Sequence, residues 1–171
     1  SAESIASAVK AAKGRGLPPV EQWDPPFCGD LDMRIARDGT WFYLGTPIGR
    51  APLVRLFSTV LKREGDRYFL VTPVEKVGTT VDDAPFLAVD FDVEGEGPTQ
   101  KLTFHTSVGD SVTADAAHPI RVESRDNEPA PYVEVRAGLE ALIDRKSFFR
   151  LVDHGVTQEI DGERVFGVWS S

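Results

Sequence analysis

Residues 49–57 read GRAPLVRLF, and residues 144–152 read DRKSFFRLV. Counted from Arg50 to Arg145, the offset is 95 residues, and both stretches place apolar pairs on either side of a second Arg. The apolar residues have helical spacing, so we expect amphipathic helices at about residues 50–61 and 145–154. A repeat of this kind is typical of a duplicated structural unit. The sequence therefore predicts two small related domains, each packed by one amphipathic helix.

Short strands with turn signals surround both helices. Asp38-Gly39 separates alternating residues at 31–36 from an apolar run at 41–44, which is a strong β-hairpin signal. Further strands are predicted at 68–71, 86–93, 102–104, 111–113, 118–122, 132–135, 156–160 and 164–169. Residues 74–85 have the composition of a loop with at most a short strand, and residues 125–131 have that of a loop. Because the strands are short and linked by hairpins, we expect mostly antiparallel sheets and an α+β fold.

The apolar-poor stretch at 75–85 is the best candidate for a domain boundary. We predict an N-terminal helix and Pro-rich connector at 1–26, a first α+β domain at 27–80 and a second at 81–171. The helix is expected within Ser1–Lys13, with Gly14 as its end. The sequence leaves open whether this helix packs on the body.

Composition limits the partners and the compartment. The 171 residues are 41% apolar and carry a net charge of −8, so an acidic surface would repel nucleic-acid polymers. Cys28 is the only cysteine, which excludes an internal disulfide and suits a reducing cytoplasm. No stretch approaches the roughly 20 apolar residues of a membrane helix, so we expect a cytoplasmic protein without a membrane partner.

The repeat supplies the first candidate site. Gly49 and Asp144 are predicted N-caps, which places Arg50 and Arg145 at the first helical residue. A cation is unfavourable there for helix stability alone, but free N–H groups beside a guanidinium suit a phosphate or carboxylate. The alternative, a surface ion pair between each Arg and a nearby acid, is the more common outcome.

A second candidate is the loop that follows the strand at 68–71. Thr72, Glu75 and Lys76 directly follow this strand end, where a rigid sheet can hold a ligand-binding loop. The alternative is that both charges are simply solvated. Arg55 and Arg150 are expected to face solvent on their helices.

Catalytic signals are weak, so we expect no enzyme, no metal site and no cofactor. The three histidines lack metal-ligand spacing, and no nucleophile elbow or phosphate-binding loop is recognisable. An enzyme would require acids such as Asp30 or Asp82 to meet His118 in a cleft. A protein-interaction module would instead require Phe86, Phe91 and Trp169 at the surface.

Six short motifs add a resemblance to a known family. They are CGD at 28–30, DGTW at 38–41, PIGR at 47–50, LVRLF at 53–57, TPVEK at 72–76 and DDAPF at 82–86. In this order and spacing the chain resembles an uncharacterised bacterial family, domain of unknown function 1285. The resemblance covers most of the chain after Val20, except the turn at 95–99.

The resemblance implies a two-domain α+β fold that arose by duplication, with a second domain superficially similar to pleckstrin-homology folds. It also implies an interdomain cleft for a nucleotide-based ligand and a role in signal transduction. Together with the repeat, it predicts a ligand-sensing protein that binds a small anion through Arg50, Arg145, Thr72, Glu75 and Lys76. The alternative is a protein-interaction module without a small-molecule ligand.

Overall fold

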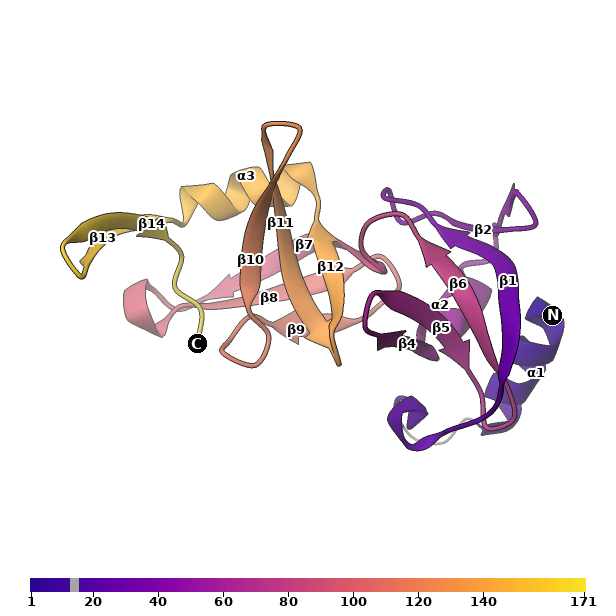
Figure 1. Cartoon of the computed structure of the whole chain (residues 1–171). Coiled ribbons are helices and arrows are strands. Elements are labelled where there is room, and N and C mark those ends of the chain that lie inside the picture. The colour runs from indigo at the N-terminus through magenta and orange to yellow at the C-terminus, as the bar shows by residue number, and fades with distance from the viewer. Residues whose placement is uncertain (13–15) are drawn as a thin grey trace. The chain divides into compact units, whose positions relative to one another are not determined.

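The computed structural model describes residues 1–12 and 16–171. The chain divides into two compact units, residues 1–85 with 137–139 and residues 86–136 with 140–171. We call these units the first and the second domain (Figure 1). The predicted helix end at Lys13 and Gly14 lies outside the described residues.

The first domain is built on a six-stranded sheet with the order β3-β2-β1-β6-β5-β4. Its first and last strands, β1 and β6, pair in parallel, and its other neighbours are antiparallel. The strands are β1 (Phe27–Ile35), β2 (Trp41–Tyr43), β3 (Thr46–Pro47), β4 (Leu61–Glu64), β5 (Arg67–Val71) and β6 (Lys76–Val81).

Helices complete the core of the first domain. In α2 (Ala51–Ser58), Phe57 is buried and stacks on Trp41 of β2 with ring centroids 6.4 Å apart. The N-terminal helix α1 (Ala2–Ala12) packs against α2 and buries Ile5 and Val9, which answers the question left open by the sequence. Each such side chain contributes about 1.5–3 kcal/mol by leaving water. A short 3-10 helix, η1 (Val20–Gln22), precedes β1.

The second domain repeats this plan. Its sheet has the order β10-β11-β12-β7-β8-β9, and its first and last strands, β7 and β12, again pair in parallel. The elements are β7 (Phe86–Glu94), η2 (Gly97–Thr99), β8 (Lys101–Thr106), β9 (Ser111–Thr113), β10 (Ile120–Arg125), β11 (Glu128–Arg136) and β12 (Leu139–Ile143). The core includes Phe91 and Phe104, whose ring centroids lie 5.4 Å apart.

The helix α3 (Arg145–Asp153) follows β12 and buries Leu151 near β7. A separate two-stranded sheet then forms from β13 (Val156–Ile160) and β14 (Glu163–Gly167). Every residue of these two strands is exposed.

Both six-stranded sheets have the same order when the strands of each domain are counted along the chain. The third strand lies at one edge, the fourth lies at the other, and the first and sixth are neighbours in the middle. This confirms two related domains of the α+β class with mostly antiparallel sheets. The repeated helical motif, however, marks helices at different points of this plan. In the first domain α2 follows the third strand, whereas in the second α3 follows the sixth.

The start and end of α2 differ from the prediction. Arg50, not Gly49, is the N-cap, with extended backbone at φ −94° and ψ 100°. The helix ends at Ser58 because Leu61, which shares its apolar spacing, pairs with Leu70 in the sheet, and the carbonyl of Val60 accepts from the N–H of Val71 at 3.0 Å. The predicted helix at 145–154 agrees well with α3, and Asp144 is its N-cap as expected.

Strands β3, β4 and β12 were not predicted, and β6 lies where at most a short strand was expected. The predicted loop at 74–85 contains β6, whose Val and Thr residues suit a central strand although it carries few large apolar side chains. The predicted loop at 125–131 is a tight hairpin in which Asp126 and Asn127 both have positive φ, as a type I′ turn requires. No strand was predicted at 139–143, where β12 lies.

Two surface expectations can also be checked. Phe86 and Phe91 are buried, so they do not form the partner surface that a protein-interaction module would require, and Trp169 is half-buried. None of the helices in residues 1–12 and 16–171 has the length and apolar composition of a membrane span.

Candidate functional site

Arg50 lies at the start of α2 with its side chain exposed. Among the residues that the structure describes, no carboxylate lies at ion-pair distance from its guanidinium. The helix start beside it offers fewer free N–H groups than expected, because Pro52 has none and the N–H of Leu53 donates to the carbonyl of Arg50 at 3.0 Å. The guanidinium therefore remains the main group here that an anion can bind.

Arg145 is the first residue of α3 and is also exposed. Its guanidinium lies 5.5 Å from the ring centroid of Phe149, and no described carboxylate pairs with it. The N-cap Asp144 accepts a hydrogen bond from the N–H of Ser147 at 3.0 Å and pairs with Lys146 at 3.2 Å. The helix start is thus already capped by a carboxylate, which leaves the Arg145 side chain rather than the backbone as the binding group.

The loop after β5 is held by its own hydrogen bonds. Thr72 is buried, and its hydroxyl accepts from the N–H of Glu75 at 3.1 Å and of Val74 at 3.3 Å. The carboxylate of Glu75 accepts from the hydroxyl of Ser4 in α1 at 3.0 Å. These contacts make the loop a connection between the sheet and the N-terminal helix.

Lys76, the last residue of the predicted set, is engaged in the same domain. Its ammonium lies 3.0 Å from Glu64 and 4.8 Å from the ring centroid of Phe69. Hydrogen bonding from Lys76, followed by that from Lys62, lowers the pKa of Glu64 below its ordinary value. None of the contacts described for Thr72, Glu75 or Lys76 involves Arg50.

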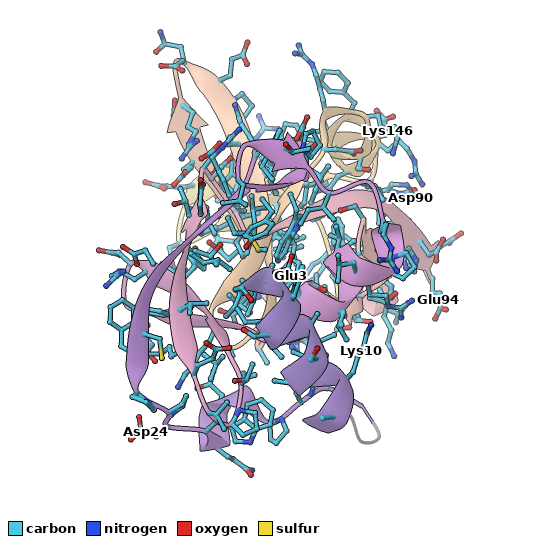
Figure 2. All side chains as sticks on the ribbon, turned by 90° about the vertical axis from the view of Figure 1, so that its right-hand side faces the viewer. Glu3, Lys10, Asp24, Asp90, Glu94 and Lys146 are labelled. Carbon is cyan, nitrogen blue, oxygen red and sulfur yellow. The ribbon has the colours of Figure 1, made fainter. Side chains whose placement is uncertain are left out.

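The two internal arginines differ from each other. Arg55 is exposed without a partner among the described residues, as expected. Arg150 instead pairs with Asp90 of β7 at 2.5 Å, and its guanidinium lies 4.4 Å from the ring centroid of Phe91. The N–H of Phe91, followed by Arg150, lowers the pKa of Asp90. Lys146 and Asp90 lie on the same side of the second domain (Figure 2).

The residues considered for catalysis are occupied in separate pairs. Asp30 pairs with Arg67 at 2.8 Å, Asp82 pairs with Arg34, and His118 pairs with Asp115 at 2.9 Å. Over residues 1–12 and 16–171 the structure contains no cluster of three His, Cys, Asp or Glu side chains suited to a metal.

Sequence reasoning missed a cross-strand row in the second domain. His105 lies 2.7 Å from Asp92 and 2.8 Å from the hydroxyl of Ser111. These are the residue types of a catalytic triad, but a triad acts in a site that excludes water and holds an oxyanion. The row lies on the open face of β7, β8 and β9, where 38% of the His105 and 70% of the Asp92 side chain is exposed. We assign it to the polar outer face of the sheet.

Two hollows were also missed. One, of about 290 Å³, lies in the first domain over β1, β5 and β6 and is lined by Asp30, Arg67 and Gly78 among others. The other, of about 230 Å³, lies on one face of the β13–β14 hairpin beside Trp169. The motif CGD at 28–30 was the available signal for the first, since it contains Asp30.

These features define a two-domain α+β protein whose sheets share one strand order. Residues 18–84 match the N-terminal domain of a family described as "Domain of unknown function (DUF1285)", and residues 85–171 match the C-terminal domain of "Protein of unknown function (DUF1285)". The chain belongs to this family.

Two crystal structures of DUF1285 family proteins are similar to this chain. The protein from Silicibacter pomeroyi DSS-3 is 61% identical, with a TM-score of 0.88, over 97% of this chain and 90% of that one. The protein from Shewanella baltica OS155 is 33% identical, with a TM-score of 0.57, over 72% of this chain and 91% of that one. No curated protein matches the chain. The resemblance inferred from the six motifs is therefore confirmed.

Proposed function

We propose that this protein binds a small anionic ligand, a nucleotide or a related phosphate ester, and reports it in signal transduction, with Arg50 as the anion-binding residue of the first domain and Arg145 as that of the second. One observation carries the proposal: neither guanidinium is paired with a described carboxylate, although Asp and Glu outnumber Lys and Arg by 27 to 19. Other arginines of the chain do pair with acids, namely Arg34, Arg37, Arg67, Arg121, Arg125, Arg136 and Arg150.

The chemistry of the two positions supports an anion rather than a neutral ligand. A guanidinium offers a planar fork of donors that matches the oxygens of a phosphate. Both side chains are exposed, so binding requires no buried group to open. Phe149, beside Arg145 and 57% exposed, adds an aromatic face on which a base can stack.

The polar side chains of the Thr72–Lys76 loop already have partners within the first domain, which limits their part in ligand binding. The hydroxyl of Thr72 and the carboxylate of Glu75 already accept hydrogen bonds, and the ammonium of Lys76 is paired. In this proposal Thr72 and Glu75 position the loop, and Lys76 binds the ligand only by leaving Glu64.

The test is isothermal titration with phosphate, pyrophosphate and a panel of nucleotides. In a separate urea-unfolding experiment, ligand at about 100 times its dissociation constant should add about 2.7 kcal/mol to the free energy of unfolding. Arg50→Ala and Arg145→Ala should each weaken binding at least about tenfold, since each removes a charge-assisted contact. Arg55→Ala is the matched control, because Arg55 is another exposed, unpaired arginine of α2. Equal affinity of the Arg50→Ala and Arg55→Ala proteins would overturn the proposal.

The alternative, a protein-interaction module, gains support from the C-terminal segment. Six exposed large apolar residues fall between positions 149 and 166: Phe149, Val152, Val156, Ile160, Val165 and Phe166. A two-stranded hairpin is marginally stable alone, and β13 carries no Lys or Pro to block pairing at its outer edge. We therefore infer, as the second candidate, that a second copy of the chain pairs with this hairpin.

Sedimentation equilibrium distinguishes this candidate. The wild-type mass should rise with concentration, and Ile160→Asp should hold the protein monomeric, because it places a charge on the apolar face. Val122→Asp, which changes an exposed apolar residue outside the segment, is the control. A wild-type protein that stays monomeric at all concentrations would exclude pairing of two copies.

A further inference from the structure

The polar hollow of the first domain is independent of the arginines at the helix starts. It measures about 290 Å³ and is lined by Asp30 of β1, Asp66 of the β4–β5 turn, Arg67 of β5, and Gly78 and Thr80 of β6, among others. Ligand pockets usually span about 300–1,000 Å³, so this hollow suits a molecule of few atoms. Its charged lining indicates a polar ligand.

The local sequence builds this hollow in three ways. Gly29 has φ +96°, a backbone conformation that favours glycine, and it directly precedes Asp30. The pairing of β1 with β6 shifts register on both sides of Asp30, as β-bulges do where a strand re-aims a side chain. Gly78, the partner of Asp30 in that pairing, leaves the space over β6 empty.

The missing side chain of Gly78 is what admits the charged groups. A Cβ atom there would lie 2.1 Å from Oδ1 of Asp30 and 3.1 Å from Nη2 of Arg67. The carboxylate and the guanidinium therefore meet directly above the backbone of β6. Neighbouring residues of a strand point to opposite faces of the sheet. In β1, Met33 and Ile35 are buried in the core, whereas the side chain of Asp30 is exposed.

The ion pair in the hollow can open to a ligand. Arg67 reaches Asp30 through one described contact, Nη2 to Oδ1 at 2.8 Å, and the two side chains are 57% and 73% exposed. Exposed pairs of this kind contribute little to stability, so separating the charges is easy. Arg67 is also oriented by aromatic rings, with its guanidinium 5.0 Å from the ring centroid of Phe69 and 5.5 Å from that of Phe27.

The charges of the lining select the ligand. A simple anion would meet two carboxylates, Asp30 and Asp66, beside one guanidinium, and a simple cation would meet Arg67. A small molecule that carries both a positive and a negative charge can pair with all three side chains. We propose that this hollow binds an α-amino acid, with the ligand carboxylate on Arg67 and the ligand ammonium on Asp30 and Asp66.

This site differs from the proposed anion site in residues and in chemistry. The ligand ammonium donates to Asp30, replacing the donor that Arg67 supplies in the free protein, and Arg67 donates to the ligand carboxylate. Thr80 is an exposed residue of the lining, and its hydroxyl can accept from or donate to a polar ligand side chain.

The test is an NMR titration of the full chain with glycine, alanine and serine at concentrations up to about 10 mM, where weak small-ligand sites saturate. Shifts should concentrate at the amides of residues 29–30, 66–68 and 78–80. Propionate, which lacks the ammonium, and ethylamine, which lacks the carboxylate, should each bind at least about tenfold more weakly than alanine. Equal binding of propionate, or no shift with any amino acid, would overturn the proposal.

Variants separate the site from a general surface effect. Asp30→Asn and Arg67→Gln should each weaken alanine binding at least about tenfold, because each removes one charge-assisted contact. Gly78→Ala should do the same while keeping both charges, since its methyl group displaces the carboxylate of Asp30. Arg55→Gln is the control, because Arg55 is an exposed arginine of the same domain that does not line the hollow. Alanine affinity that is unchanged in folded Asp30→Asn and Gly78→Ala proteins would also overturn it. Phosphate binding should be unaffected by Asp30→Asn, so this site and the anion site can fail separately.

Discussion

Oδ1 of Asp30 lies 2.1 Å from the point that a Cβ atom at Gly78 would occupy. Because Asp30 is a short, exposed side chain, it can rotate away, so we expect Gly78→Ala to fold with a free energy of unfolding within about 1 kcal/mol of the wild type. What the variant should lose is the interaction of Asp30 with Arg67. A double-mutant cycle of Asp30→Ala and Arg67→Ala should give a coupling of about 0.2–1 kcal/mol in the wild type and about zero with Ala at position 78.

The control for this prediction is Gly167→Ala. Gly167 also lies in a strand, its added Cβ would meet no heavy atom within 4 Å, and its φ is not positive. The coupling should survive in that background. A coupling that persists in the Gly78→Ala protein would show that the carboxylate does not need the empty position.

The N-caps of α2 and α3 predict opposite effects of substitution. Asp144 accepts a hydrogen bond from the N–H of Ser147, so Asp144→Ala should lower the free energy of unfolding by about 0.5–2 kcal/mol. Asp144→Ser should retain most of the wild-type free energy of unfolding, because Ser is also a favourable N-cap. Urea unfolding checks both, and equal losses for the two variants would mean that the side chain does not act as a cap.

At α2 the N-cap Arg50 makes no side-chain cap hydrogen bond. Arg50→Asp should therefore stabilise the first domain by about 0.5–1 kcal/mol, by capping the helix and placing a negative charge at its start. Under the proposed function the same change should abolish anion binding. Gain of stability with loss of binding would separate the two roles of this position, and a loss of stability would contradict the cap argument.

The sequence predicted the domain plan and α3 well, because periodic apolar residues and an N-cap are local signals. It misplaced the end of α2, since Val60 and Leu61 satisfy the helical stripe and only the distant Leu70 draws Leu61 into a strand. β6 was expected to be at most a short strand for a related reason: a strand between two partners of one sheet needs few large apolar residues if Val and Thr fill it.

The repeated Arg motif was informative about helices but not about their equivalence. The duplication lies in the order of the strands, and that order depends on pairing between residues far apart in sequence, such as Ile35 with Val81 and Ile143 with Ala88. The hollow at Asp30 was likewise beyond local patterns. It depends on Gly78 lying opposite Asp30 across two strands that are distant in the chain.

The docking of α1 gives a further prediction. Ile5 is fully buried on the side of α1 that packs on α2, so Ile5→Ala should cost about 2–4 kcal/mol through lost contacts and a cavity. Ser7→Ala, an exposed change on the same helix, should stay within about 0.5 kcal/mol. Both values come from urea unfolding, and hydrogen exchange of the α1 amides should accelerate only in the first variant. Equal exchange in both would mean that α1 is not held by this side chain.

The ion pairs of Glu64 predict how stability changes with pH. Lys76, and after it Lys62, lowers the pKa of Glu64 from its ordinary value of 4.5. The unfolded chain therefore binds a proton at this group before the folded one does, so its contribution is present above pH 4.5 and is lost as the pH falls through the folded pKa. Glu64→Gln should flatten the fall of the free energy of unfolding in acid, measured in urea from about pH 6 to pH 3.

Glu94→Gln, at an exposed residue of β7 without a described ion-pair partner, should keep the wild-type profile (Figure 2). Salt should weaken the effect of Glu64, since the carboxylate is 38% exposed and its pairs are screened. A Glu64→Gln profile as steep as that of the wild type would show that other carboxylates account for the acid sensitivity.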